Sequence, residues 1–521
     1  MNSTSLARSV IRQLIEDGVS DFVISPGSRN APLSIALYEA ENLGLVNLYV
    51  RIDERGAAFF ALGLSKASNN YVAVICTSGT AAANFHPAIL EAYHSANKLL
   101  AITADRPAHL RRTGANQTTL QVGLLEPVPS IDIASSMDLS DVLSNGPVHL
   151  NIQFDEPLLS DDRTAWLAGL SPRTKNLSMD EMQAHFSPKA RGLVVVGHDR
   201  AGLPKEEIAK FADAFGWPLI AEDPLSFPTS IAHAALVMTD PDLRATLMPE
   251  QVVVVGRPTL SRSISALIRE CAEVIVVDPR TATVDTDRGA SQIFSSLPIG
   301  DASPEADWLV SWEQMSALTN GAMELDWSEQ EAIRTITSNI PEGSGLFIGS
   351  SRPIRDIEEY ADPRSGITTF ANRGLAGIDG NISCAFGIAE KFERSYAIVG
   401  DITFLHDLSA LVNPSTANLT IFIINNNGGG IFNTLPQSGV EGFEKLFGTP
   451  HDLDLAKVIQ GFGNSVSKVK GVTDLAHLIA HNASGLNFVV VEVPDRVTNA
   501  LSLKSVTQSL VSALRIGSNL A

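Results

Sequence analysis

The chain has 521 residues and a formal net charge of −20 at pH 7. This length exceeds what one hydrophobic core normally supports and predicts two or three α/β domains. The negative charge argues against binding to nucleic acid or to an anionic membrane, and no apolar run is long enough to span a bilayer. The three cysteines lack disulfide or metal-binding spacing and the N-terminus has no signal-peptide core, so we expect a soluble, cytoplasmic protein.

Short β-branched apolar runs that stop abruptly at Gly, Ser, Asp, Arg or Pro recur along the whole chain. Such runs are typical of strands that are buried on both faces of a parallel sheet. In chain order they are DFVISPGSR, YVAVICTSGT, LLAITADRP, RGLVVVGHDR, QVVVVGRP, EVIVVDPRT, GLFIGSSRP, SYAIVGDIT, LTIFIINNNGGG and NFVVVEVPD. Stretches of helical period, such as ERGAAFFALGLSKAS, lie between them. The alternation predicts an α/β fold of doubly wound parallel sheets.

Two polar stretches, around residues 158–190 and 298–335, interrupt the alternation and contain few strand patterns. We interpret them as linkers, which gives three domains near 1–160, 190–300 and 335–521. The sequence contains no repeat, although the outer two domains could share an architecture. Because ligands of parallel sheets bind just beyond the carboxyl ends of the strands, the loops at those ends are the candidate site.

Two consecutive predicted strands of the last domain end in residues suited to a metal. Asp401 follows the first of them, and Asn426 and Gly428 follow the second. A pyrophosphate bound through Mg²⁺ needs hard oxygen ligands, which the Asp401 carboxylate, the Asn426 side-chain carbonyl and the Gly428 backbone carbonyl would supply. Either motif alone could be a strand end or a turn. Their separation of about 25 residues, with a helix and a strand between, predicts neighbouring loops at one sheet edge.

Cationic and polar side chains follow other predicted strands. They are Ser28, Arg29, Thr77, Arg106, Asn116, Gln117, Arg262, Ser351, Arg355 and Arg373. The planar fork of Arg binds carboxylates bidentately. Any one of these arginines could instead pair with an internal Asp or Glu. Five of them after different strands predict a pocket for substrates that carry several carboxylates.

The segments GDITFLHD and NNNGGGIFNTLP resemble the metal-binding motif of thiamine diphosphate (ThDP)-dependent enzymes, which runs from GDG to NN. Ile402 stands where the third motif residue is usually Gly, as in the branch of 2-succinyl-5-enolpyruvyl-6-hydroxy-3-cyclohexene-1-carboxylate (SEPHCHC) synthases of menaquinone biosynthesis. SPGSRNAPL, TADRP with GANQ, SRPIR and ANRGLAGIDG resemble the same branch over nearly the whole chain. The resemblance implies a ThDP-dependent transferase with Mg²⁺ or Mn²⁺, 2-oxoglutarate as donor, isochorismate as acceptor and CO₂ as by-product.

The resemblance also implies roles for apolar and acidic residues. Glu54, in RIDERGAAFFALG, matches the carboxyl group that binds the cofactor's aminopyrimidine and promotes formation of its carbanion. On its own this acidic run would be a solvated helix start. Ile378 matches the apolar residue that keeps the cofactor bent. Ile431, Phe432 and Leu435 match an apolar wall over the reacting carbon, and they could equally be the packed start of a helix.

The polar strand-end residues receive their roles from the same resemblance. Ser28 and Thr77 would contact the cofactor. The intermediate would be oriented by Gln117, Ser351, Arg29, Arg106, Arg355 and Arg373. The substrates would also be bound by Ser28, Asn116, Arg262, Phe432 and Leu435. We expect His406 to cap a helix rather than to act in catalysis.

In such enzymes Glu54 of one chain meets the diphosphate site of another, which implies a homodimer or homotetramer. Another ThDP-dependent 2-oxo acid decarboxylase or an acetolactate-type carboligase is the main alternative function. A nucleotide-binding module and a regulatory subunit without activity are weaker alternatives.

Overall fold

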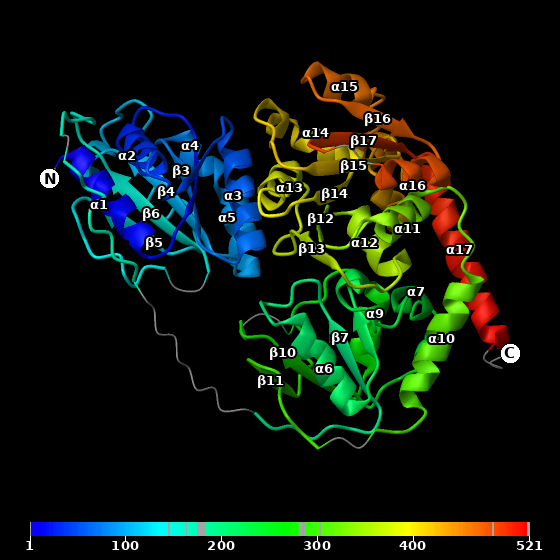
Figure 1. The fold of residues 1–521 in the computed structure, drawn as a ribbon. Helices are drawn as coiled ribbons and strands as arrows, with labels where there is room; N and C mark the ends of the chain where they lie inside the picture. Colours follow the sequence, from blue (N-terminus) through cyan, green and yellow to red (C-terminus); the bar gives the residue numbers. More distant parts are fainter. Residues whose placement is uncertain are drawn as a thin grey trace. The chain divides into compact units, whose positions relative to one another are not determined.

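The computed structural model describes residues 2–143, 146–162, 164–173, 184–280, 285, 288–301, 304–481 and 484–517. It contains three parallel sheets of six, five and six strands with helices between them (Figure 1), which confirms the predicted fold class. The chain divides into two compact units. The first comprises Met1–Met179, Gly374–Glu393 and Thr403–Asn418, and the second comprises Asp180–Arg373, Arg394–Ile402 and Leu419–Ala521.

The first sheet belongs to the first unit. Its strands are β1 (Asp21–Ile24), β2 (Asn47–Val50), β3 (Val72–Cys76), β4 (Leu99–Asp105), β5 (Ser130–Ile133) and β6 (Val148–Gln153). They pair in the order β2-β1-β3-β4-β6-β5. The helices α1 (Ser3–Glu16) and α2 (Ala31–Glu41) bury their apolar faces against one side of the sheet. The helix α3 (Glu54–Ser68) contacts β1, β3 and β4 without joining that core, so it covers the opposite side together with α4 (Thr80–Asn84) and α5 (His86–Ser95).

The second unit contains the five-stranded sheet. Its strands β7 (Gly192–Val196), β8 (Leu219–Ala221), β9 (Gln251–Val255), β10 (Glu273–Val277) and β11 (Gln292–Phe294) pair in the order β11-β10-β9-β7-β8. One face is covered by α6 (Lys205–Phe215), whose phenylalanines pack with Phe186 and Trp217. The other face is covered by α7 (Ala234–Val237), α8 (Pro241–Thr246), α9 (Arg262–Glu270) and α10 (Trp308–Ala322).

The helix α10 falls inside the stretch 298–335 that the sequence suggested to be a linker. Trp308 and Trp312 are buried in the core of the five-stranded sheet. The stretch looked like a linker because its polar residues outnumber the few large apolar ones that make this contact. The other proposed linker contains no strand or helix among its described residues.

The third sheet also lies in the second unit. Its strands are β12 (Ser344–Ile348), β13 (Ile367–Ala371), β14 (Ser395–Gly400), β15 (Leu419–Asn425), β16 (Val466–Val469) and β17 (Leu486–Glu492). The order β13-β12-β14-β15-β17-β16 repeats that of the first sheet strand for strand. One face is covered by α11 (Glu329–Asn339), α12 (Arg352–Tyr360) and α16 (Val472–Ala480). The remaining helices are α13 (Asn381–Ala389), α14 (Asp401–His406), α15 (Leu455–Gly461) and α17 (Arg496–Gly517).

Both six-stranded sheets have a topological switch point, where successive crossovers leave in opposite directions. In the first sheet it lies between β1 and β3, and in the third between β12 and β14. Ligands of open parallel sheets bind in the crevice at this point. Arg29 and Thr77 lie in the loops at the first switch point. At the other switch point, Ser351 follows β12 and Asp401, the first residue of α14, follows β14.

The helices α3 and α13 of the first unit pack unusually close together. A Cβ atom added at Gly63 of α3 would lie 2.1 Å from the backbone carbonyl oxygen of Cys384 in α13. Only glycine permits this backbone approach. The small residues of ERGAAFFALG therefore serve helix packing as well as helix formation.

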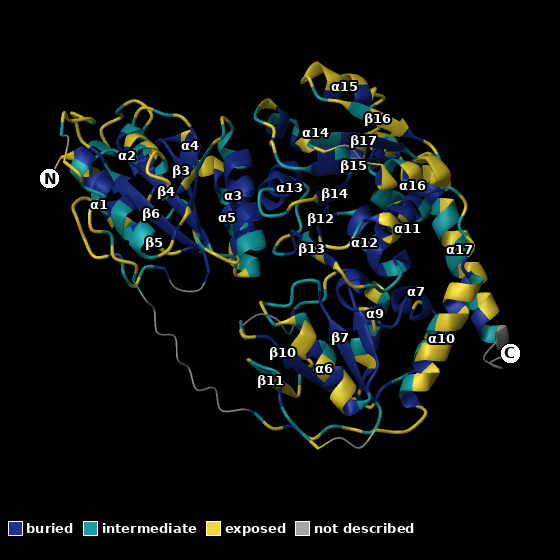
Figure 2. Ribbon diagram, in the orientation of Figure 1, coloured by how far each residue is buried: buried dark blue, intermediate teal, exposed yellow. Residues whose placement is uncertain are grey.

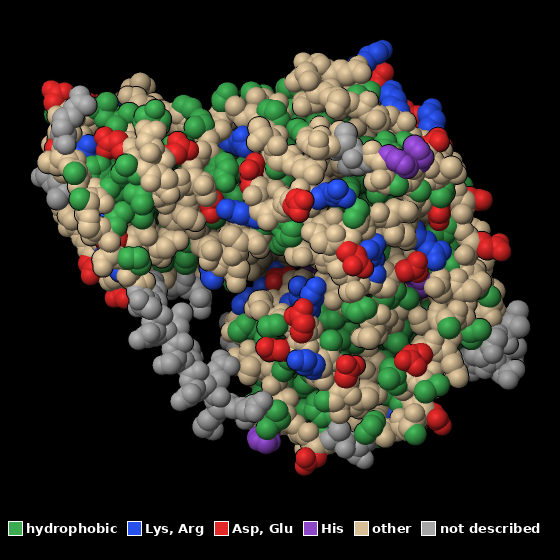
Figure 3. All heavy atoms as spheres, in the orientation of Figure 1, with side chains coloured by type: hydrophobic (Ala, Val, Ile, Leu, Met, Phe, Trp, Pro, Cys, Tyr) green, Lys and Arg blue, Asp and Glu red, His purple; other side chains and the backbone are tan. Residues whose placement is uncertain are grey.

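Buried residues concentrate in the strands of the three sheets (Figure 2). Cys76, Cys271 and Cys384 are buried free thiols. None of the described helices is long and apolar enough to cross a membrane. Acidic and basic side chains are interspersed on the face shown in Figure 3, so local positive charge coexists with the overall negative charge.

Candidate active site

Arg29 lies at the carboxyl end of β1 in the first unit. Its guanidinium donates to the carbonyl oxygen of Phe154 at 3.1 Å and forms an ion pair with Glu156 at 3.3 Å. The neighbouring Ser28 is exposed, whereas Thr77, just beyond β3, is buried. The carboxyl ends of β1 and β3 are adjacent because these strands pair in parallel.

Arg106 and Gln117 are joined to each other through Ser78. The Arg106 guanidinium donates to Ser78 Oγ at 2.9 Å and to the Gln117 carbonyl oxygen at 2.6 Å. The Gln117 side-chain amide donates to the Ser78 carbonyl oxygen at 3.0 Å, and Gln117 adopts a left-handed φ of 54°. Asn116 is exposed beside it. These bonds hold the GANQ loop over the end of β3.

Arg106 lies close enough to Arg29 for their charges to repel. Burial, and then the positive charge of Arg29, lower the pKa of Arg106 below its ordinary value. An anion bound between two such guanidinium groups would relieve the repulsion. This part of the first unit is therefore suited to a carboxylate.

Glu54 is the first residue of α3, whose N-cap is Asp53. The side chain is half-buried and makes no hydrogen bond or ion pair with the rest of the described chain. Burial and the negative charge of Glu54 raise the pKa of Cys76, which places the carboxylate near the end of β3. An acid without a protein partner at a strand end is free to bind a ligand.

Ile378 lies half-buried in the loop between β13 and α13. Glu91 of α5 holds the start of this loop, because its buried carboxylate accepts backbone N–H groups of Gly374 at 2.7 Å and Leu375 at 2.6 Å. Glu91 was not predicted from the sequence. It occurs in an ordinary helical pattern, and its partners lie almost 300 residues away.

The proposed metal ligands of the second unit form one compact cluster. Asp401 is 2% exposed, and its Oδ2 accepts the Gly428 N–H at 2.8 Å. Asn426 is buried, and its Oδ1 has no hydrogen-bond partner among the described residues. Gly428 has a φ of 137°, and a Cβ there would lie 2.3 Å from the Gly448 carbonyl oxygen. An orphaned buried oxygen beside a carboxylate fits a bound cation, so these residues suit Mg²⁺ or Mn²⁺ with a diphosphate.

Two further residues of the metal cluster were missed in the sequence. Glu329 accepts the Asn426 Nδ2–H at 2.6 Å, and His451 Nε2 lies 3.2 Å from Asp401 Oδ2. Glu329 and His451 lie outside the two loops that carry Asp401, Asn426 and Gly428. Their distance along the chain from these ligands therefore gives no signal for them.

Ser351 and Arg355 lie at the amino end of α12. Ser351 is its N-cap with a φ of 79°, a region that costs a non-glycine residue roughly 1–3 kcal/mol. Its carbonyl oxygen accepts a hydrogen bond from the Arg355 guanidinium at 2.7 Å. Burial, followed by the charges of Arg373 and Arg352, lowers the pKa of Arg355. The backbone of Ser351 is thus strained, and the charged form of Arg355 is destabilised.

Arg373 is only 4% exposed. Its Nε and one terminal nitrogen donate to Thr259 Oγ1 at 3.1 and 2.6 Å. Thr259 was missed because GRPTLSR reads as a turn, and only Arg262 was singled out in it. Arg262 itself is exposed at the first position of α9.

Ile431, Phe432 and Leu435 follow the metal cluster around a short helical turn, Gly430–Thr434. All three are half-buried, and the Phe432 ring lies 5.6 Å from that of Phe447. They present partly accessible apolar surface next to the proposed ligands Asn426 and Gly428.

The structure thus gathers the predicted residues into two groups. Ser28, Arg29, Glu54, Thr77, Arg106, Asn116, Gln117 and Ile378 belong to the first unit. Arg262, Ser351, Arg355, Arg373, Asp401, Asn426, Gly428, Ile431, Phe432 and Leu435 belong to the second.

The family comparisons cover almost the whole chain. Residues 4–124 match the family described as "Thiamine pyrophosphate enzyme, N-terminal TPP binding domain". Residues 159–348 match "Middle domain of thiamine pyrophosphate", and residues 355–493 match "Thiamine pyrophosphate enzyme, C-terminal TPP binding domain". Thiamine pyrophosphate is another name for ThDP.

Full-length relatives carry one name. The 2-succinyl-5-enolpyruvyl-6-hydroxy-3-cyclohexene-1-carboxylate synthase of Nocardioides sp. is 40% identical over 94% of either chain. The synthase of the same name from Thermobifida fusca is 36% identical over 98% of this chain and 100% of its own. The synthase of the same name from Lysinibacillus sphaericus is 33% identical over 91% of this chain and 92% of its own. This chain belongs to the SEPHCHC synthase family of ThDP-dependent transferases.

Proposed function

We propose that the protein decarboxylates 2-oxoglutarate and adds the resulting four-carbon unit to isochorismate in a 1,4 sense, releasing CO₂, as a step of menaquinone biosynthesis. The observation that carries this proposal is the placement of arginines beyond the carboxyl ends of strands in both six-stranded sheets. Arg29 and Arg106 are close enough to repel in the first unit, as are Arg355 and Arg373 in the second. Two pairs of this kind suit a donor and an acceptor that each carry two carboxylates.

The cofactors of the proposal are ThDP and Mg²⁺ or Mn²⁺. Bound ThDP supplies the carbanion and the electron sink of the decarboxylation. Asp401, Asn426 and the Gly428 carbonyl would hold the metal and, through it, the diphosphate. Glu54 would hold a proton against a pyrimidine nitrogen of the cofactor, since its carboxylate has no partner in the described chain.

The remaining predicted residues bind and orient. Ile378 would support the bent cofactor, with Ser28 and Thr77 at its pyrimidine end. Gln117 and Ser351 would orient the substrates through hydrogen bonds. The apolar side chains of Ile431, Phe432 and Leu435 would keep water from the reacting carbon and so delay protonation.

The arginines and Asn116 complete the proposed pocket. Arg29, Arg106, Arg355 and Arg373 would bind carboxylates in a fork, and the exposed Arg262 would add a fifth cation. We further propose a homodimer or homotetramer in the cytoplasm, with domains near 1–160, 190–300 and 335–521.

The test follows isochorismate absorbance with purified protein, ThDP, Mg²⁺ and 2-oxoglutarate, omitting each component in turn. We expect loss of isochorismate only when all are present, with a product whose mass equals isochorismate plus 2-oxoglutarate minus CO₂. CO₂ release without loss of isochorismate would support the assignment of ThDP and refute isochorismate as the acceptor. If folded protein that binds ThDP neither consumes isochorismate nor releases CO₂, the assignment of 2-oxoglutarate and isochorismate as substrates is refuted.

A further inference from the structure

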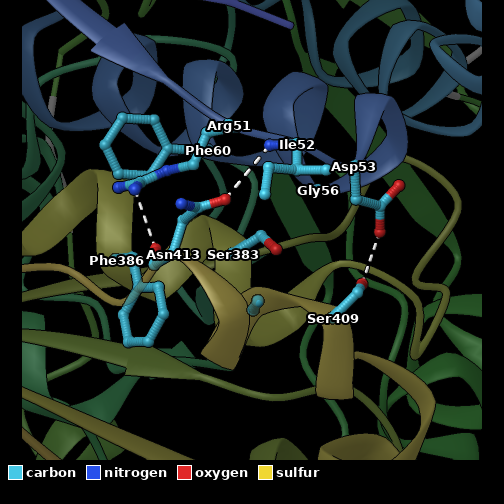
Figure 4. A pocket seen from close by; sticks show the side chains of 10 residues that line it. Arg51, Ile52, Asp53, Gly56, Phe60, Ser383, Phe386, Ser409 and Asn413 are labelled. Carbon is cyan, nitrogen blue, oxygen red and sulfur yellow. Dashed lines mark hydrogen bonds between the residues drawn. The ribbon is translucent and has the colours of Figure 1, made fainter. Parts of the chain in front are cut away.

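Arg51 and Ile52, on the amino side of Glu54, both bind Asn413, a residue far away in the sequence. Its carbonyl oxygen accepts a hydrogen bond from the Arg51 guanidinium at 2.7 Å, and its Oδ1 accepts the Ile52 N–H at 3.2 Å (Figure 4). Arg51 also lies over the Phe60 ring, with 4.1 Å between Cζ and the ring centroid. The approach to α3 is therefore fixed before the helix begins.

The N-cap of α3 is held by the same segment of chain. Asp53 Oδ1 accepts the Arg55 N–H at 3.0 Å, and Asp53 Oδ2 accepts the hydroxyl of Ser409 (Figure 4). The Ser409 hydroxyl fixes the rotamer in which the carboxylate caps the helix. Loss of an N-cap hydrogen bond frees the first turn, whose N–H groups have no partners within the helix.

Arg55, on the other side of Glu54, is bound by the last residue of α14 and by the residue that follows it. Its guanidinium donates to the His406 carbonyl oxygen at 2.9 Å and lies 3.5 Å from Asp407 Oδ1. Asp407 is fully buried, and its Oδ2 accepts the Ser383 N–H at 2.8 Å in the first turn of α13. Burial is the main cause that raises the pKa of Asp407 to about 6, so the group is ionised at neutral pH.

Glu54 is the exception within this run. Arg51, Ile52, Asp53 and Arg55 each bind residues between 406 and 413, while Glu54 binds nothing in the described chain. The cavity among these contacts measures about 10 Å³, room for about one water molecule. The surrounding side chains therefore contact one another and leave no room for a substrate.

We infer that residues 406–413 form a clamp that positions the Glu54 carboxylate, with Asp407, Ser409 and Asn413 as positioning residues. Helix starts are held weakly by the helix itself, and a misplacement of 1 Å in a catalytic group can cost about 100-fold in rate. The clamp supplies the missing restraint from both sides. This inference rests on the proposed role of Glu54 toward ThDP.

The test compares Ser409→Ala with Ser415→Ala, its matched control. Ser415 lies two residues beyond Asn413, is buried and donates to Glu390 at 2.6 Å, and it makes no hydrogen bond to α3 among the described residues. In protein without cofactor, Ser409→Ala should speed amide hydrogen exchange of residues 52–57 by about 10-fold or more, because the opening free energy of the first turn falls. Ser415→Ala should leave these amides unchanged.

The second readout is the exchange of the thiazolium C2 proton of bound ThDP, followed by NMR without substrate. Ser409→Ala should slow it about 10- to 100-fold, and Ser409→Thr, which restores a hydroxyl, should recover most of the rate. A variant that only weakened the fold would change the thermal midpoint without this rescue. Asn413→Ala removes one contact to Ile52 and serves as a second variant if Ser409→Ala does not fold.

Glu54→Gln separates the two proposals. If Glu54→Gln leaves the C2 exchange unchanged, the proposed role of Glu54 toward ThDP is refuted, and with it the catalytic effect of the clamp. If Glu54→Gln slows the exchange while Ser409→Ala and Asn413→Ala behave like Ser415→Ala, the clamp alone is refuted.

Discussion

Asn426 donates a hydrogen bond from Nδ2 to Glu329 at 2.6 Å, and this bond decides which way its side-chain amide faces. Because Nδ2 is occupied, Oδ1 is the atom that stays free for a cation. Second-layer partners of metal ligands typically change metal affinity 10- to 100-fold.

Glu329→Ala should therefore weaken Mg²⁺ binding about 10- to 100-fold, measured as the Mg²⁺ dependence of ThDP binding by calorimetry. Glu331→Ala, two residues along α11 and half-buried, is the control and should bind normally. Asp401→Ala should abolish metal-dependent ThDP binding altogether. An unchanged titration for Asp401→Ala would show that the metal binds elsewhere.

Glu54→Gln should preserve the fold and lower kcat by the 10²- to 10⁴-fold that is typical of lost acid–base participation, that is, by about 100-fold or more. The neutral amide keeps the size of the side chain and removes its proton-holding capacity. Steady-state kinetics and circular dichroism measure the two effects separately. Near-normal turnover would exclude Glu54 from the reaction.

Gly63→Ala should destabilise the protein by about 1–3 kcal/mol, since the added methyl group meets backbone that no rotamer change can move. The nearest atom, the Cys384 carbonyl oxygen, would lie at 2.1 Å. Gly321→Ala in α10 is the control, because a Cβ there meets nothing within 4 Å. Denaturant unfolding should show no loss for Gly321→Ala and a gain of up to about 1 kcal/mol from helix propensity. Equal midpoints for both variants would contradict the close packing of α3 on α13.

His149 should make the protein sensitive to acid. The ring is buried between Thr103 Oγ1 and Ser130 Oγ, each 2.8 Å away, and burial lowers its pKa from 6.5 to about 4. Between these two values the unfolded chain binds the proton and the folded chain does not. The stabilising effect is thus complete above pH 6.5 and is lost as the pH falls toward 4, a change of about 3 kcal/mol.

The measurement is the difference in free energy of unfolding between wild type and His149→Gln at pH 7 and at pH 4. Wild type should lose about 3 kcal/mol relative to this variant on acidification. His109→Gln, at an exposed position, controls for the loss of any histidine. A difference that does not change with pH would show that His149 is charged in the folded protein.

How far the sequence predicts the sheets depends on where each strand lies. Every one of the ten apolar runs contains an interior strand. The six edge strands β2, β5, β8, β11, β13 and β16 were missed, because an edge strand is short or half-exposed and needs no continuous apolar run. The missed interior strand, β6, carries His149 and Asn151, whose burial depends on hydrogen bonds to Thr103 that no local pattern reveals.

The sequence alone determined the fold class, the family and the residues at the strand ends, because these follow from short patterns that parallel sheets and diphosphate binding impose locally. Tertiary structure decided what holds those residues. Glu329 behind Asn426, Thr259 beside Arg373, and Ser409 against Asp53 each join elements that lie more than 90 residues apart. Single hydrogen bonds between distant elements leave no periodicity or spacing in a sequence, so only the folded chain reveals them.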